Sequence, residues 1–234
     1  GTFYPAGMSR KNFLTYYSRR FNAVEMDSTF YGTPRAKSVL RWAEITPEHF
    51  QICPKVPRAI THESGLVEAG AQAKLSEFLA VMQLLNGKLG PILVQFPPMF
   101  GFEQMETLAA FVANLPSELR FAVEFRHRSW YRKETAVLLR RHNICWTAAD
   151  YIHLPKRLHR TSDFLYLRFI GPHGQFPGKD REMVDKSEDL ARWWRQIQPH
   201  LDDVTDVYGF FNNDYAGYSP ATTNRFRGIL GLEP

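Results

Sequence analysis

The sequence holds little that points to a secreted or membrane-bound protein. Only two of its 234 residues are cysteine, Cys53 and Cys145, and both lie inside apolar, strand-like segments. A disulfide scaffold and a zinc ribbon are therefore excluded, and we expect two reduced core residues. No segment reaches the roughly 20 apolar residues that a membrane helix needs, and no signal peptide is visible. We therefore expect a cytoplasmic protein with no membrane partner.

Common motifs for nucleotide binding and nucleophilic catalysis are also missing. The chain has no GxGxxG, no GxxxxGK[ST] and no GxSxG segment, so neither a Rossmann or P-loop site nor a nucleophile elbow is indicated. HExxH and paired-histidine spacings are absent as well. We therefore predict no cofactor.

Charge is only mildly one-sided. Lys plus Arg total 29 against 24 for Asp plus Glu, which gives a net charge of +5 and a pI of about 9.2. Hydrophobic residues make up 44% and charged residues 23% of the chain, as in an ordinary folded domain. The basic bias is compatible with an anionic partner, either a small substrate or a nucleic acid, but does not require one.

Short apolar segments alternate with amphipathic ones. Strands are expected at 24–28, 51–56, 92–96, 121–126, 145–150, 164–169 and 206–211. Helices are expected at 10–20, 36–44, 71–86, 103–114, 133–142, 187–198 and 220–230. Such alternation is typical of parallel βα units. The sequence therefore predicts an α/β fold, a TIM-type (β/α) barrel of about seven visible parallel strands, as a single domain over residues 1–234.

Two places depart from a regular barrel. The closed type has eight strands, so we expect the first strand to be missing or to lie upstream of Gly1. The segment 151–163 contains Pro155 and is too short for a crossover helix with its loops. We expect an irregular connection there.

Polar side chains gather at one end of the expected strands. In 121–126, alternation places Glu124 and Arg126 on the face opposite the apolar one. Polar residues fall at the carboxyl ends of other strands too, where barrel enzymes build their active sites. We therefore expect a site of mixed charge, either an active site or a structural ion-pair network. Its members are Glu25, Asp27, Lys55, Gln95, Glu124, Arg126, Asp150 and Arg168.

Loops after the strands add further polar residues. His62 either orients a loop or takes part in acid–base chemistry. The stretch RHRSWY contains His127 and Trp130, and arginine beside an aromatic ring suits phosphate or carboxylate binding. A well-packed loop anchor is the competing interpretation. The FNND run, which binds a ligand or caps the next turn, adds Asn212, Asn213 and Asp214.

Six segments carry a family resemblance: VEMDSTFYGTP (24–34), FQICPKVPRAITH (50–62), LGPILVQFPPMF (89–100), VEFRHRSWY (123–131), TSDFLYLRFIG (161–171) and YGFFNND (208–214). In this order they resemble the YecE-like family, known as domain of unknown function 72, over essentially the whole chain. The resemblance implies a TIM-barrel-like fold but no established reaction. Family members begin with a strand and a glycine-rich turn before the FYP motif, which here is residues 3–5. The resemblance also implies a site at the family's recurring polar positions, which here include Tyr31 and Thr61 besides the residues named above.

The combined interpretation is an enzyme of hydrolase, isomerase or lyase type that acts on an anionic or phosphorylated polar substrate. Lys55, Arg126 and Arg168 would bind the anion, and carboxylates would act as general acid and base. The predicted catalytic residues are Glu25, Lys55, Glu124 and Asp150. The predicted substrate-binding residues are Asp27, Tyr31, His62, Gln95, Arg126, His127, Trp130, Arg168, Asn212, Asn213 and Asp214.

Other functions stay open. A nucleic-acid-binding or repair-type nuclease protein, related in fold to endonuclease IV-like barrels, fits the net charge of +5 and basic clusters such as 156–160. Such nucleases use a multi-metal, histidine-rich site that this sequence does not show. A non-catalytic ligand-binding protein is a further alternative. A divalent metal would have basic neighbours, and its ligands would come from Glu25, Glu124, Asp150 and Asp214.

Overall fold

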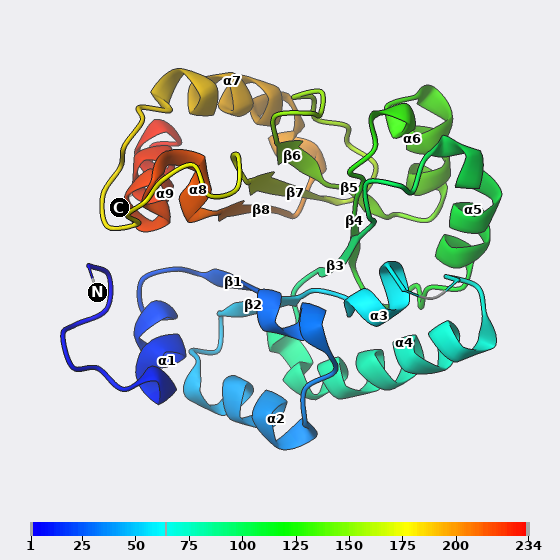
Figure 1. Cartoon of the computed structure of the whole chain (residues 1–234), viewed down its shortest axis with the longest axis horizontal. Helices are drawn as coiled ribbons and strands as arrows, with labels where there is room; N and C mark the ends of the chain where they lie inside the picture. Colours follow the sequence, from blue (N-terminus) through cyan, green and yellow to red (C-terminus); the bar gives the residue numbers. More distant parts are fainter. Residues whose placement is uncertain (1, 64, 233–234) are drawn as a thin grey trace. The chain divides into compact units, whose positions relative to one another are not determined.

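Short parallel strands alternate with helices in the computed structural model, which describes residues 2–63 and 65–232 (Figure 1). The described chain forms two compact units. The N-terminal unit lies within residues 6–144, and the C-terminal unit consists of residues 145–232 with residues 2–5. That the whole chain forms a single domain stays a prediction.

The N-terminal unit is built on two parallel strand pairs, β1 with β2 and β3 with β4. Isolated bridges, Ile52 to Leu89 and Lys55 to Leu93, connect β2 with the segment around β3. Its strands are β1 (Ala23–Met26), β2 (Gln51–Pro54), β3 (Ile92–Gln95) and β4 (Phe121–Glu124). Its α-helices are α1 (Phe13–Tyr17), α2 (Ala36–Ile45), α3 (Arg58–Thr61), α4 (Ala69–Met82), α5 (Met105–Ala113) and α6 (Lys133–Arg141). Its 3-10 helices are η1 (Arg10–Asn12), η2 (Asp27–Tyr31), η3 (Gln83–Lys88), η4 (Phe102–Gln104) and η5 (Arg128–Trp130).

The C-terminal unit is built on a parallel sheet in the order β6, β7, β8. Segment 151–163, which leads from β6 to β7, contains no helix in the described chain, as expected. The strands are β5 (Cys145–Trp146), β6 (Ala148–Asp150), β7 (Phe164–Phe169) and β8 (Asp206–Phe211). The helices are α7 (Ser187–Ile197), η6 (Gln198–Asp203), α8 (Asn213–Ala216) and α9 (Ser219–Ile229).

The expected strands are present, with differences at their ends. β1 stops at Met26 because the chain enters η2 at Asp27. β2 stops at Pro54, which is paired with Met26, the last residue of β1. The expected strand 145–150 is interrupted at Thr147 and forms β5 and β6.

The structure shows a mixed α/β fold with parallel sheets, and it confirms this part of the predicted fold class. The further prediction, a closed TIM-type barrel, is not shown. Among the described strands no closed barrel is found. One reason is local, because β2 and β3 are joined only by isolated bridges and not by a continuous ladder.

The core of the C-terminal unit follows from strand alternation. Leu165, Leu167 and Phe169 of β7 share the apolar face that the sequence predicts, and they pack with Trp193 of α7 and Phe226 of α9. The opposite face of β7 carries two buried aromatic residues, Phe164 and Tyr166, and the half-buried Arg168. The predicted reduced state is also confirmed for the two cysteines, which are both free and buried.

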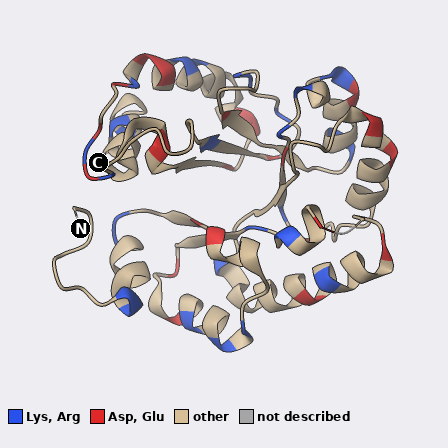
Figure 2. Cartoon of the chain, viewed as in Figure 1, with Lys and Arg blue, Asp and Glu red and all other residues tan. Residues whose placement is uncertain are grey.

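Both signs of charge occur on the same helices. Figure 2 shows basic and acidic residues together along α6 and along α7. Exposed charge of mixed sign neutralises itself locally, so it gives weaker attraction to a polyanion than a basic face of one sign. In the part of the chain that the structure describes, no helix combines the length and the apolar character needed to cross a membrane.

Candidate functional site

Polar residues lie at the carboxyl ends of strands in both units, as the alternation predicts. Gln95, Glu124 and Asp150 are the last residues of β3, β4 and β6. Asp27 and Lys55 follow β1 and β2 directly. The N-terminal unit thus contains the candidates up to Trp130, and the C-terminal unit contains Asp150, Arg168 and the FNND run.

In the N-terminal unit, two basic side chains converge on one amide oxygen. Lys55 Nζ donates to Gln95 Oε1 at 2.9 Å, and Arg126 Nη2 donates to the same oxygen at 3.4 Å. Arg126 Nε also pairs with Glu124 Oε1. Lys55 and Glu124 are buried, and Glu124 has no exposed surface. We call Lys55, Gln95, Glu124 and Arg126 the Gln95 cluster.

The backbone of Lys55 is held by Thr29 from η2. Thr29 Oγ1 accepts from the Lys55 backbone N–H at 2.8 Å, and it lies 2.7 Å from Lys55 O and 2.8 Å from Met26 O. A hydroxyl has one proton, so it donates to one of these two carbonyls at a time. Thr29 is buried, and it therefore fixes the start of the Lys55 side chain.

The Lys55 ammonium has an aromatic neighbour as well. Nζ lies over the Phe30 ring, 4.1 Å from its centroid, and 4.0 Å from Oδ1 of the exposed Asp27. The ring face attracts a cation. Tyr31, the next residue, leaves 80% of its surface exposed. Lys55 is thus bounded by an amide, a ring and a carboxylate.

His62 contacts the same aromatic ring. Its imidazole meets Phe30 edge-on, with ring centroids 5.2 Å apart, and its Nδ1 lies 2.7 Å from Thr61 Oγ1. Partial burial lowers the pKa of His62, and the positive charges of Lys55 and Arg58 lower it further. The imidazole is therefore neutral at pH 7.

Residues of the RHRSWY stretch take part in packing and in helix capping. Trp130 is fully buried, stacks on Phe100 and Phe125, and donates its indole N–H to Phe100 O at 2.6 Å. A ligand would reach it only if this stack opened. His127 caps η5, where its Nδ1 accepts from the Ser129 N–H at 3.3 Å.

Glu25 lies half-buried on β1, in register with Cys53 of β2. Burial raises the pKa of the Cys53 thiol, and the nearby Glu25 carboxylate raises it further. The thiol is therefore protonated and unreactive. The register of β1 and β2 therefore places Glu25 beside Cys53.

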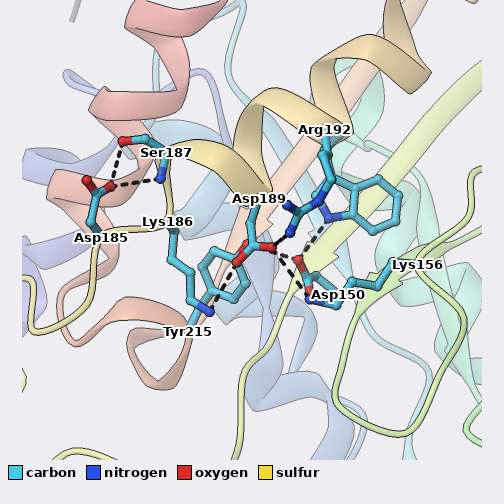
Figure 3. A network of polar contacts seen from close by, with 9 residues as sticks. Asp150, Lys156, Asp185, Lys186, Ser187, Asp189, Arg192 and Tyr215 are labelled. Atoms are coloured by element: carbon cyan, nitrogen blue, oxygen red, sulfur yellow. Dashed lines mark hydrogen bonds and ion pairs between the residues drawn. The ribbon is translucent and has the colours of Figure 1, made fainter.

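In the C-terminal unit, Asp150 is a buried acceptor at the centre of a polar network (Figure 3). Its Oδ2 accepts from Trp193 Nε1 and from Tyr215 OH, both at 2.9 Å. Its Oδ1 lies 2.8 Å from Lys156 Nζ. Burial and the Asp150 carboxylate raise the pKa of Tyr215, so its hydroxyl stays a donor. We call these four residues the Asp150 network.

A second carboxylate extends this network. Asp189 lies 3.9 Å from Lys156 Nζ and 3.3 Å from Lys186 Nζ, and it pairs with Arg192 on the same helix (Figure 3). Cations and carboxylates therefore alternate around the start of α7. Arg168, on β7, is half-buried and lies on the face opposite the apolar one.

The FNND run folds as a local cap. Asn212 accepts from the Asp214 N–H at 3.0 Å, and Asn213 accepts from the Ser219 N–H at 2.8 Å. Asp214 is buried, 3.1 Å from Lys179 Nζ and 3.7 Å from His173 Nδ1. Burial alone would raise the pKa of Asp214, but the hydrogen bonds from Lys179 and the Gly174 N–H outweigh it, and the pKa is lowered.

Metal ligation finds little support in this geometry. Within residues 2–63 and 65–232, no group of three or more His, Cys, Asp or Glu side chains is placed to hold a metal ion. Among the carboxylates that the sequence suggested as ligands, Glu124, Asp150 and Asp214 each pair with a basic side chain. Their negative charge is already offset within the protein.

Sequence reasoning missed several residues of these sites. Thr29 and Phe30 lie inside the VEMDSTFYGTP segment, and Tyr215 directly follows FNND, so motif proximity was the available signal. Tyr131 ends the RHRSWY stretch, and burial together with the Glu124 carboxylate raises the pKa of its phenol. Lys156 belongs to the basic cluster 156–160 that the sequence suggested for nucleic-acid binding, and its pairing with Asp150 was not predicted.

Two bacterial proteins are similar to this chain in sequence. The UPF0759 protein YecE of Escherichia coli strain K12 is 36% identical over 120 residues, which cover 51% of this chain and 43% of YecE. The match therefore spans less than half of that relative. The UPF0759 protein YunF of Bacillus subtilis strain 168 is 25% identical over an alignment of 256 residues, which covers 98% of this chain and 90% of YunF.

Solved structures share the fold. A DUF72 family protein from Enterococcus faecalis V583 has a TM-score of 0.80 at 24% identity and covers 96% of each chain. Another from Thermotoga maritima MSB8 has a TM-score of 0.79 at 26% identity and covers 99% of this chain and 96% of its own. The family model described as "protein of unknown function DUF72" matches residues 1–234. This chain therefore belongs to the DUF72 family.

Proposed function

We propose that this protein is an enzyme that acts on an anionic or phosphorylated polar substrate, which Lys55 and Arg126 bind at the carboxyl ends of β2 and β4. The observation that carries the proposal is the convergence of both cations on Gln95 Oε1. Hydrolysis, isomerisation and elimination all fit such a site. A TIM-like barrel with the site at its C-terminal mouth is part of the proposal.

The argument rests on the chemistry of the shared acceptor. A neutral amide oxygen that accepts from two charged donors stands where an anionic oxygen would form shorter and stronger bonds. The guanidinium of Arg126 and the ammonium of Lys55 are the donors that phosphate and carboxylate groups prefer. Because Lys55 is buried, its attraction to an anion is less screened than on the surface.

The two carboxylates on these strands have different surroundings. Glu124 is buried and paired with Arg126, so we assign it to orienting the guanidinium. Glu25 is half-buried, and we keep it as the proposed carboxylate acid or base. The substrate contacts predicted for Asp150, Arg168 and the FNND run stay predictions.

The test is Gln95→Glu, which places a carboxylate where both cations already point. Calorimetry with inorganic phosphate should show binding to the natural protein and at least a tenfold loss in the variant, about 1.4 kcal/mol. The variant should unfold at higher urea concentration, because its new carboxylate pairs with Lys55 and Arg126. Gln83→Glu, an exposed change in the same unit, is the control for net charge.

Three outcomes separate the candidate functions. Unchanged phosphate binding in Gln95→Glu would reject the cluster as the anion site. Failure of the natural protein to bind phosphate or any member of a panel of phosphorylated and carboxylated compounds would reject the function. Salt-dependent binding of labelled oligonucleotides that Gln95→Glu removes, without small-anion binding, would favour the nucleic-acid alternative.

A further inference from the structure

Phe30 joins the proposed anion site to a histidine. The Lys55 ammonium occupies the face of the Phe30 ring, and the His62 imidazole meets its edge at an interplanar angle of 79°. Both residues therefore lie around one side chain, and Thr29, one position before Phe30, clamps the Lys55 backbone. The anion site and the imidazole are parts of one local structure.

The His62 ring is oriented but not enclosed. It directly follows α3, and its Nδ1 bonds to Thr61 Oγ1 at 2.7 Å. Among the residues that the structure describes, no hydrogen bond to His62 Nε2 is found. The side chain is half-buried. A fixed imidazole that is half-buried and contacts the same ring as the Lys55 ammonium has the form of a proton-transfer group.

We infer that His62, in addition to the Glu25 carboxylate, exchanges a proton through Nε2 with the anionic substrate held by Lys55 and Arg126. This inference rests on the proposed function. As an acid, the imidazolium gives its Nε2 proton to the leaving oxygen of the substrate. The N–H bond breaks and an O–H bond forms as the bond between that oxygen and the rest of the substrate breaks, and the ring becomes neutral. As a base, the neutral ring takes the proton back from water or from the substrate.

The charges that face His62 make its protonation depend on the substrate. Lys55, Arg58 and Arg126 favour the neutral ring, and Glu63 favours the charged one. A bound anion offsets the positive charges, so it raises the pKa of His62. By linkage, protonation of His62 strengthens anion binding by the same factor. Substrate binding would thus favour the protonated His62 imidazole, which is the form that acts as an acid.

The experiment follows the imidazole nitrogens by NMR in protein labelled with ¹⁵N-histidine. The signals are titrated between about pH 5 and 8, with and without inorganic phosphate, and His62→Gln identifies the His62 signal. Phosphate should move the His62 midpoint upward by about one pH unit or more. The signal of His49, an exposed histidine of the same unit, should not follow it.

A second variant keeps the two proposals apart. Lys55→Met should abolish phosphate binding in calorimetry and the phosphate effect on His62 together, while Lys37→Met, which changes an exposed residue of α2, should change neither. Phosphate binding with an unmoved His62 midpoint would overturn the inference and leave the proposed function standing. Failure of the natural protein to bind phosphate and every member of the panel of phosphorylated and carboxylated compounds would overturn both.

Discussion

The two units place charged residues at strand ends in the same way and neutralise them differently. In the Gln95 cluster, two cations share a neutral amide oxygen. In the Asp150 network, one carboxylate accepts from Trp193, Tyr215 and Lys156. The first arrangement gains from an incoming anion, because an anionic oxygen bonds more strongly than an amide. The Gln95 cluster also contains a carboxylate, Glu124, but the acceptor that its two cations share is neutral. In the Asp150 network the shared acceptor is itself the carboxylate, and this network is best explained as an anchor between the strand end and helices α7 and α8.

This difference affects how polar residues at the carboxyl ends of strands are interpreted from a sequence. A buried charge is costly unless it is paired and hydrogen-bonded, so polar residues at strand ends indicate either a site or a network. Sequence position does not distinguish these two cases. The identity of the acceptor does: a neutral acceptor for two cations suggests a ligand site, and a carboxylate with several donors suggests a structural role.

Removing the Asp150 carboxylate gives the largest expected effect. Asp150→Ala should lower the free energy of unfolding by about 2–6 kcal/mol, because two buried donors lose their acceptor at about 1–3 kcal/mol each. Urea unfolding measures the loss. Asp203→Ala, which removes an exposed carboxylate 3.4 Å from Arg160, should change it by no more than about 0.5 kcal/mol.

Asp150→Asn is the more conservative variant, for use if Asp150→Ala does not fold. It keeps one oxygen for Trp193 and Tyr215, so it should lose less stability than the alanine variant. Phosphate binding in the N-terminal unit should be unaffected by it. A variant as stable as the natural protein, with altered phosphate binding, would place Asp150 in the ligand site and end the contrast between the units.

A matched pair of tryptophans gives a smaller effect. Both indoles are buried, but Trp193 donates to a carboxylate and Trp130 donates to the Phe100 carbonyl. Trp193→Phe should cost about 1 kcal/mol more than Trp130→Phe, because hydrogen bonds to charged groups contribute about 1.5–3 kcal/mol against about 0.5–1.5 for neutral ones. Equal losses in urea unfolding would show that the Asp150 charge adds nothing to its anchor.

The strands were predictable because alternation and composition agree in them. In β7 the apolar residues Leu165, Leu167 and Phe169 all reach the helix side. The ends of the helices were harder to predict from the sequence. The helix expected at 10–20 begins as η1, where Ser9 forms no side-chain cap, and continues as α1, which ends at Tyr17.

The partners of the site residues were mostly beyond sequence reasoning. Thr29 holds Lys55 across 26 residues of chain, a contact that depends on how η2 returns to the end of β2. Lys156 reaches Asp150 from an irregular segment, where neither period nor motif applies. Alternation predicts which face a residue occupies, whereas these contacts depend on where loops end in space.

The smallest expected effect is a difference between the two units in how far mild acid lowers their stability. The pKa of His62 lies below its usual 6.5, so below about pH 6.5 the unfolded chain binds more protons at this residue than the folded chain does. Stability therefore falls as the pH drops from 6.5 towards the folded pKa. Asp214 behaves differently. Its pKa is lowered from 3.8, so its contribution is present above that value and is lost only as the pH falls through the folded pKa.

Hydrogen exchange read by mass spectrometry tests this directly. Between pH 7 and pH 5, after correction for intrinsic exchange rates, protection should fall in segment 50–62 and hold in segment 206–216. His62→Gln should remove most of the pH dependence in the first segment, because glutamine does not titrate. Equal loss in both segments, or a loss that survives in His62→Gln, would mean that the sensitivity comes from another group. The N-terminal unit is expected to respond near neutral pH because its imidazole lies among cations, and the C-terminal unit to resist because each buried carboxylate already has its cation.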